Sequence, residues 1–177
     1  HLTPYVIVVS AQSPIQSFAD LVDRIRKSGT PLTYGSTGPG SPQQLATLLL
    51  AQQLKLPALI EVPFKGSSAA HPDLIANRVD FMIDPLAASG PHIKSGLLRA
   101  LAVTTAKRWP GAPEIPTMAE AGIAGYESSA WFGLLAPVAT PPAIVNKLNA
   151  EIVRIIQQPD VRKQMLEAGS EPIGNTP

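Results

Sequence analysis

The chain has 177 residues, of which 45% are hydrophobic and 15% charged, and its net charge is +1. This composition indicates a globular chain, and the absence of basic blocks argues against nucleic-acid binding. No cysteine is present, which excludes disulfides and thiolate metal sites, and no apolar stretch is long enough to cross a membrane.

The first two thirds of the chain alternate between strand-like and helix-like segments. "PYVIVVS" predicts a buried strand over Pro4–Ser10, because it is rich in β-branched residues. Ser17 and Gly29 bound an amphipathic helix, and Ser41, Pro42 and Gln44 mark the start of another that reaches about Leu56. Further strands are predicted at 31–36, 59–64, 79–84 and 98–105, and further helices at 65–78 and 86–96. The alternation predicts an α/β fold with a doubly wound, mainly parallel sheet.

The remaining third has a different composition. Residues 106–129 are rich in proline and glycine, which predicts a surface excursion, and "AWFGLLAP" (130–137) predicts an extended run. Amphipathic helices are expected at 140–158 and 159–169. The chain opens inside a strand-like run and ends in a turn-like one, so we expect a piece of a longer chain.

A glycine-rich turn, "YGSTGPGS", follows the second predicted strand, and two kinds of chemistry fail there. Gly35 and Gly40 have P-loop spacing, but Ser41 and Pro42 stand where that motif needs Lys and Ser/Thr. A nucleophile elbow around Ser36 would need a glycine in place of Tyr34. It would also need a histidine base, and no histidine is expected beside it.

The histidines offer no alternative centre. His71 and His92 are interpreted as surface residues, and His1 opens the chain. No metal-ligand spacing and no paired carboxylates are present, so the sequence predicts no catalytic residue, no metal and no cofactor.

Anion binding needs less, because glycines let the backbone approach a ligand and a helix start offers unpaired N–H groups. The predicted carboxylate cradle consists of Ser36, Thr37, Gly38, Gly40 and Ser41. A tight turn that only caps the next helix remains the alternative.

If the sheet is parallel, the neighbouring strand ends lie at the same edge. We therefore expect the cleft to be lined also by Gln44, Phe64, Lys65, Gly66, Ser67 and Asp84. A solvated lysine and a turn aspartate are the alternatives for Lys65 and Asp84.

Four blocks of the sequence together resemble a known family. They are "LTYGSTGPGSPQQLATLLL", "VPFKGSSAAHPDLIANRVDFMIDPLAA", "LRALAVTTAKRWPGAPEIPTMAEAG" and "GYESSAWFGLLAPVATPPAIVNKLNAEI". Their order and spacing are similar to those of the Bug family of extracytoplasmic solute receptors, the substrate-binding subunits of tripartite tricarboxylate transporters.

The resemblance implies a periplasmic protein with a type II periplasmic-binding-protein-like fold, whose two lobes close on a small carboxylate. The ligand would be a di- or tricarboxylate, an acidic amino acid or an aromatic acid, passed on to the membrane permease subunits. Residues 1–130 would form the second lobe with the first crossover strand. Residues 131–177 would form the returning crossover and helices of an incomplete first lobe.

The family's "PPGG"-like turn, its signal peptide and its C-terminal helix have no match in this chain. Trp131 and Phe132 begin the returning strand near the expected hinge, where core packing is the favoured interpretation. The competing functions are a small α/β hydrolase that uses Ser36 on a carboxylic ester and a receptor that signals to a sensor kinase.

Overall fold

The computed structural model describes all 177 residues, which form a lobe built on a mixed sheet and an extended C-terminal arm. The strands are β1 (Leu2–Ser10), β2 (Thr33–Ser36), β3 (Ile60–Pro63), β4 (Phe81–Pro85), β5 (Leu98–Val103) and β6 (Ser129–Trp131). The helices are α1 (Phe18–Lys27), α2 (Pro42–Gln53), α3 (Ser67–Ile75), α4 (Leu86–Lys94), α5 (Pro142–Ile156) and α6 (Pro159–Glu167). No helix combines the length and the hydrophobicity needed to span a bilayer.

The sheet has the order β3-β2-β4-β1-β5, and β6 pairs with the part of β1 that leaves the lobe. β2 runs parallel to β3 and to β4, whereas β1 runs antiparallel to β4, β5 and β6. The α/β fold class is confirmed, but the sheet is mixed rather than mainly parallel.

The direction of β1 explains this correction. β1 and β2 are joined through α1, which suggested a parallel crossover, yet β2 begins at the same edge of the sheet at which β1 ends. The connection through α1 therefore returns to the edge it left. Alternation of strands and helices specifies a helical connection, but it does not specify whether that connection crosses the sheet.

β1 is the centre of the core because both of its faces are buried. Tyr5, Ile7 and Val9 join the cluster under α1 and α2, and that cluster also contains Met118 and Tyr126 from the proline-rich excursion. Val6 and Val8 join a second cluster on the opposite face, under α3 and α4, where Trp109 and Ile115 pack. A strand buried on both faces reads as a continuous apolar run, which is the pattern of "YVIVV".

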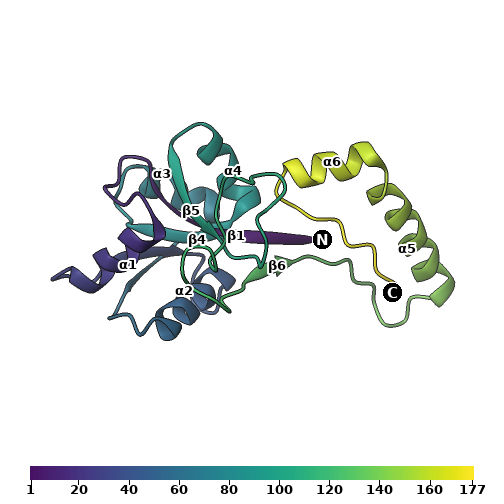
Figure 1. The fold of residues 1–177 in the computed structure, drawn as a ribbon. Coiled ribbons are helices and arrows are strands. Elements are labelled where there is room, and N and C mark those ends of the chain that lie inside the picture. Colours follow the sequence, from purple (N-terminus) through teal and green to yellow (C-terminus); the bar gives the residue numbers. More distant parts are fainter.

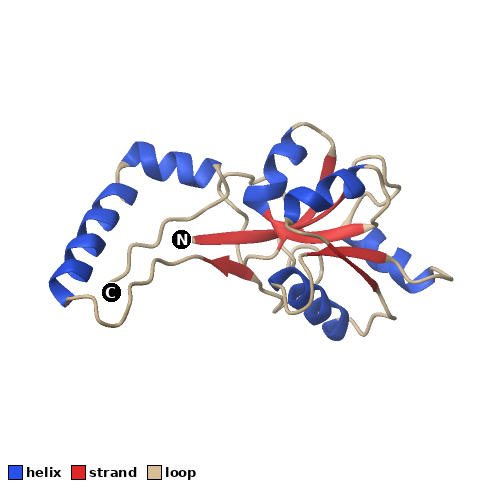
Figure 2. Ribbon diagram, turned by 180° about the vertical axis from the view of Figure 1, so that it is seen from behind, coloured by secondary structure: helices blue, strands red, loops and turns tan.

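The arm (residues 132–177) lies apart from the sheet, as Figures 1 and 2 show. It is joined to the lobe by β6 and by a return segment, in which Leu2 and Glu171 exchange backbone hydrogen bonds of 2.9 and 2.7 Å. α5 and α6 contain no buried residue. The large apolar side chains that the arm leaves exposed are Phe132, Leu134, Leu135, Val138, Ile144, Leu148, Ile155 and Ile173.

Trp131 and Phe132 lie at the junction of lobe and arm, and the expectation of core packing is wrong for both. Trp131 is 73% exposed and Phe132 is 54% exposed. The Phe132 ring stacks on His1 with a centroid distance of 4.8 Å, and its backbone N–H donates to the His1 carbonyl. These side chains are exposed because the ribbon of β1 and β6 has left the sheet, so no helix covers it.

Candidate functional site

β2, β3 and β4 share one direction, so their carboxyl ends lie at one edge of the sheet, and α2, α3 and α4 begin just beyond it. The N-terminal half of β1 reaches the same edge, since Tyr5 lies opposite Pro85. The structure thus brings together the strand ends from which the sequence predicted a binding cleft. Ligands of α/β proteins commonly bind outside such an edge.

The turn that links β2 to α2 has the left-handed backbone expected of its glycines. Gly38 has φ 104° and Gly40 has φ 75°, values that an L side chain rarely adopts. Ser41 caps α2, because its hydroxyl accepts the Gln44 backbone N–H at 3.2 Å. The capping signal read from the sequence is therefore confirmed.

Glu61, which the sequence analysis missed, is the centre of a hydrogen-bond network under this turn. The Ser36 hydroxyl donates to Glu61 Oε1 at 2.5 Å, and the Gln44 side-chain amide donates to Glu61 Oε2 at 2.7 Å. The same two side chains accept the N–H groups of Gly38 and Gly40, at 2.9 and 2.7 Å respectively. Both glycine amides, which were predicted to hold a ligand, therefore have internal partners.

Other backbone N–H groups at this edge remain available. Those that make no hydrogen bond within the chain belong to Thr37, Gln43, Lys65, Gly66, Ser67 and Ser68. They come from the two turns that follow β2 and β3, which are neighbouring strands. The first N–H groups of a helix lack partners for geometric reasons, and together with the helix dipole they favour an anion.

The second turn adds a cation to these donors. Lys65 is exposed and makes no hydrogen bond or ion pair within the chain, and Phe64 beside it is half-buried. Gly66, with φ 104° and ψ 160°, occupies the cap position of α3 without any side-chain cap. Only glycine adopts this backbone conformation without strain, so the turn brings bare backbone to the edge of the sheet.

Asp84 lies behind the edge rather than on it. Its carboxylate is fully buried and accepts three hydrogen bonds, from the Ser67 and Ser89 hydroxyls at 2.5 Å each and from His71 Nε2 at 2.9 Å. The interpretation of His71 as a surface residue is wrong, because this side chain is buried under α3, where its ring also meets the edge of His92. A buried carboxylate needs such donors to offset the loss of water.

The two acidic networks affect the tyrosines nearest to them. Burial raises the pKa of Tyr5, and the Asp84 carboxylate raises it further, since a second negative charge is unfavourable there. Burial also raises the pKa of Tyr34, with a smaller contribution from Glu61. Both phenols therefore stay neutral at physiological pH.

Ser36 does not have the surroundings of a nucleophile. It is fully buried, and its hydroxyl is shared between the Glu61 carboxylate and the Gly38 N–H, with no histidine among its partners. Serine nucleophiles need a base aligned on the hydroxyl and access to the substrate. No group of three or more His, Cys, Asp or Glu side chains is placed to hold a metal ion.

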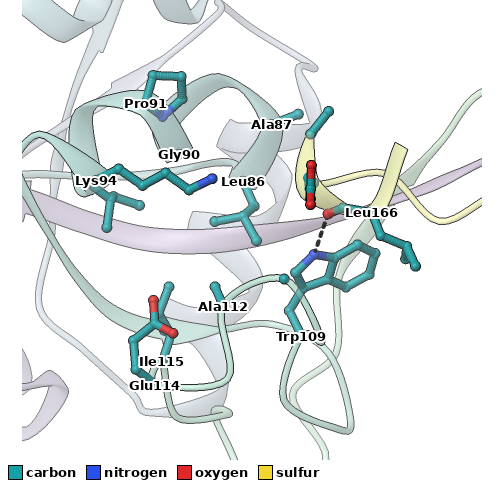
Figure 3. A pocket seen from close by; sticks show the side chains of 15 residues that line it. Leu86, Ala87, Gly90, Pro91, Lys94, Trp109, Ala112, Glu114, Ile115 and Leu166 are labelled. Carbon is teal, nitrogen blue, oxygen red and sulfur yellow. Dashed lines mark hydrogen bonds between the residues drawn. The ribbon is translucent and has the colours of Figure 1, made fainter. Parts of the chain in front are cut away.

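A cavity of about 330 Å³ lies between α4, the 109–115 loop and the end of α6 (Figure 3). Leu86, Trp109 and Leu166 form apolar walls, and Lys94 and Glu114 supply charged groups. None of the residues predicted from the sequence to bind a ligand borders it. The cavity marks the contact between the lobe and the arm, where Trp109 Nε1 donates to the Leu166 carbonyl at 3.4 Å.

The fold and the edge together define an α/β protein with the features of an anion-binding protein, since its strand ends present unpaired amides and a lysine. A family model described as the tripartite tricarboxylate transporter family receptor matches residues 1–176, and the chain belongs to this family.

Solved structures and a curated relative agree with this assignment. A Rhodopseudomonas palustris protein solved with adipate is 38% identical with a TM-score of 0.91, over 97% of this chain and 57% of its own. MatC from Rhodopseudomonas palustris, solved with bound malate, is 33% identical with a TM-score of 0.85, over 96% of this chain and 57% of its own. The UPF0065 protein in the tcbD-tcbE intergenic region of a Pseudomonas species is 40% identical over 175 residues. That match covers 98% of this chain and 52% of the relative, so the chain spans about half of the relative's length.

Proposed function

We propose that this chain is part of a periplasmic solute receptor that captures a small dicarboxylate and delivers it to the membrane permease of a tripartite transporter. In this proposal the hydroxyls and amides of the chain hold the ligand through hydrogen bonds and form no covalent bond with it.

The observation that carries this proposal is the set of unpaired N–H groups in the turns after β2 and β3, with Lys65 beside them. Thr37 and Gln43 would donate to one side of a carboxylate. Lys65, Gly66 and Ser67 would donate to the other, and the lysine would supply the neutralising charge. N–H groups aimed at an anion in this way act without a reactive side chain.

Two family members support the proposed ligand class. One of the solved relatives carries adipate and another carries malate, and both are small dicarboxylates. This chain offers one anion-binding edge, so we propose that it holds one carboxylate, while the second meets the other lobe. Binding that bridges two lobes selects their closed arrangement, since only that arrangement satisfies both ends of the ligand.

The two parts of the chain have different roles in this proposal. Residues 1–130 would form the second ligand-binding lobe, and residues 131–177 would lead back to the first. The exposed apolar side chains of the arm support this division, because nothing in these 177 residues covers them. Large groups of adjacent apolar side chains are normally buried against another surface.

The test is a thermal-shift and calorimetric screen of the protein expressed from the complete gene that encodes these residues. Succinate, malate, glutarate and adipate are compared with their diamides, which keep the shape and remove the charge. A dicarboxylate at about 100 times its dissociation constant should add about 2.7 kcal/mol of stability, roughly 5–10 °C in Tm, and its diamide should add none.

Lys65→Gln should weaken the binding of every dicarboxylate that shifts the wild type. Lys94→Gln is the matched control, since Lys94 is an exposed lysine at the far end of α4. The proposal fails if no carboxylate stabilises the wild type. If Lys65→Gln and Lys94→Gln bind the dicarboxylates with equal affinity, Lys65 does not contact the ligand.

A further inference from the structure

Glu61 occupies an unexpected place for a negative charge, directly under a turn proposed to bind an anion. It lies on the edge strand β3 opposite Tyr34, and its half-buried side chain lies against the start of α2. A carboxylate that merely contacted the ligand would repel it. The contacts of Glu61 indicate another role.

The two oxygens of Glu61 bind two different parts of the turn. Oε1 accepts from Ser36, the last residue of β2, and Oε2 accepts from Gln44 in the first turn of α2. The carboxylate therefore connects the residues that enter and leave the 36–41 turn. Hydrogen bonds to an ionised acceptor are shorter and stronger than neutral ones, which suits a fixed link.

Both partners pass this restraint on to a glycine amide. Ser36 Oγ accepts the N–H of Gly38, and Gln44 Oε1 accepts the N–H of Gly40. With the Gln44 amide nitrogen held by Glu61, its oxygen faces Gly40 and cannot be exchanged for the nitrogen without losing both bonds. Gly38 and Gly40, whose backbones have left-handed φ values and, as glycines, the widest conformational choice, are thus held in one conformation.

We infer that Glu61 is a positioning residue of the carboxylate site: it touches no ligand, and it holds the 36–41 turn so that the neighbouring amides stay aimed at the anion. This inference rests on the function proposed above. A turn fixed before the ligand arrives loses less conformational freedom on binding, so the cost of removing Glu61 falls on affinity.

Two substitutions separate position from charge. Glu61→Ala removes both links. Glu61→Gln can retain both, because its oxygen accepts from Gln44 while its NH₂ group donates to Ser36 Oγ. Affinities for succinate, malate and adipate are measured by calorimetry on protein from the complete gene. The control variant is Glu114→Ala, because Glu114 is exposed and makes no ion pair. Glu61→Ala should weaken every ligand that binds by a similar factor of at least ten, and Glu61→Gln should stay within threefold of the wild type.

Amide hydrogen exchange measured by NMR tests the same inference without a ligand. Glu61→Ala should speed exchange at Gly38 and Gly40 by at least tenfold. The Gly122 amide, which donates to the Ala119 carbonyl elsewhere, should not change. Gln44→Ala keeps Glu61 and should release Gly40 alone, and it is informative even if Glu61→Ala folds poorly.

The outcomes distinguish the two proposals. If the wild type binds none of the dicarboxylates, the proposed function fails, and the exchange rates still decide whether Glu61 fixes the turn. Unchanged exchange at both glycines in Glu61→Ala overturns the inference. Losses of affinity that differ from ligand to ligand, or a large loss in Glu61→Gln, would show direct contact with the ligand and overturn it as well.

Discussion

Replacing Asp84 with alanine should destabilise the lobe more than any exposed acidic substitution. The Asp84 carboxylate is fully buried and accepts from Ser67, Ser89 and His71. Alanine leaves the Ser89 hydroxyl and the His71 ring buried without this partner. Each buried donor left unsatisfied costs about 1–3 kcal/mol, so we expect a total loss of about 3–5 kcal/mol. For a domain of this size, this corresponds to a fall in Tm of roughly 10–15 °C.

Urea unfolding at pH 7, followed by circular dichroism, measures this loss. Asp84→Asn should cost less stability than Asp84→Ala, because the asparagine carbonyl oxygen still accepts a hydrogen bond. It should still cost some stability, because the asparagine NH₂ group faces another donor. Asp23→Ala is the control, because Asp23 pairs with Lys27 on the surface and exposed pairs contribute about 0–1 kcal/mol. A loss for Asp84→Ala as small as that of the control would refute the reasoning that the buried network stabilises the lobe.

Three further outcomes are expected from local geometry. Gly66→Ala should lower the free energy of unfolding in urea by roughly 1–3 kcal/mol, because only glycine adopts φ 104° with ψ 160° without strain. The control is Gly90→Ala, which lies inside α4 with open space around it and should raise that free energy by about 0.5–1 kcal/mol. Equal effects of the two substitutions would contradict this prediction. Tyr126→Phe should cost about 0.5–1.5 kcal/mol, since the buried hydroxyl donates to the Ala46 carbonyl at 2.8 Å, and an unchanged midpoint would count against that bond. The pKa of Glu120 should lie below its ordinary value of 4.5 in an NMR titration, because hydrogen bonds from the Thr117 N–H and then from Arg108 favour the carboxylate. The stability that Glu120 contributes to the fold is therefore present above pH 4.5 and is lost as the pH falls through the lowered pKa. Arg108→Ala should raise the pKa of Glu120.

The local parts of the fold could be predicted from the sequence because their signals are contained in a few adjacent residues. The start of α2 is predicted by Ser41, Pro42 and Gln44, and in the structure Ser41 caps this helix. The apolar run of β1 predicted a buried strand, and the structure shows both of its faces buried, with its side chains divided between the two core clusters.

The features that could not be predicted depend on which strands become neighbours. Glu61 reads as an ordinary polar residue of a short edge strand, and it becomes important only because β3 pairs with β2 and places it beside Ser36. His71 reads as a helix-start residue until Asp84 is placed beside it by β4. The direction of β1 has the same origin, since no local signal says at which edge a connecting helix returns.

The course of β1 has a mechanical consequence. Its C-terminal half is held between β4 and β5 in the middle of the sheet, whereas Leu2, Thr3 and Pro4 pair with β6 in a narrow ribbon, which Glu171 of the return segment joins at Leu2. Narrow ribbons carry a larger twist than wide sheets. The closure proposed above would therefore proceed as torsion of this ribbon, and its fixed end lies at Tyr5 and Val6, which face Pro85 and Asp84 in the register. A torque applied through the arm would then be delivered to the strand ends proposed to hold the ligand, so that binding and lobe rotation would share one mechanical element.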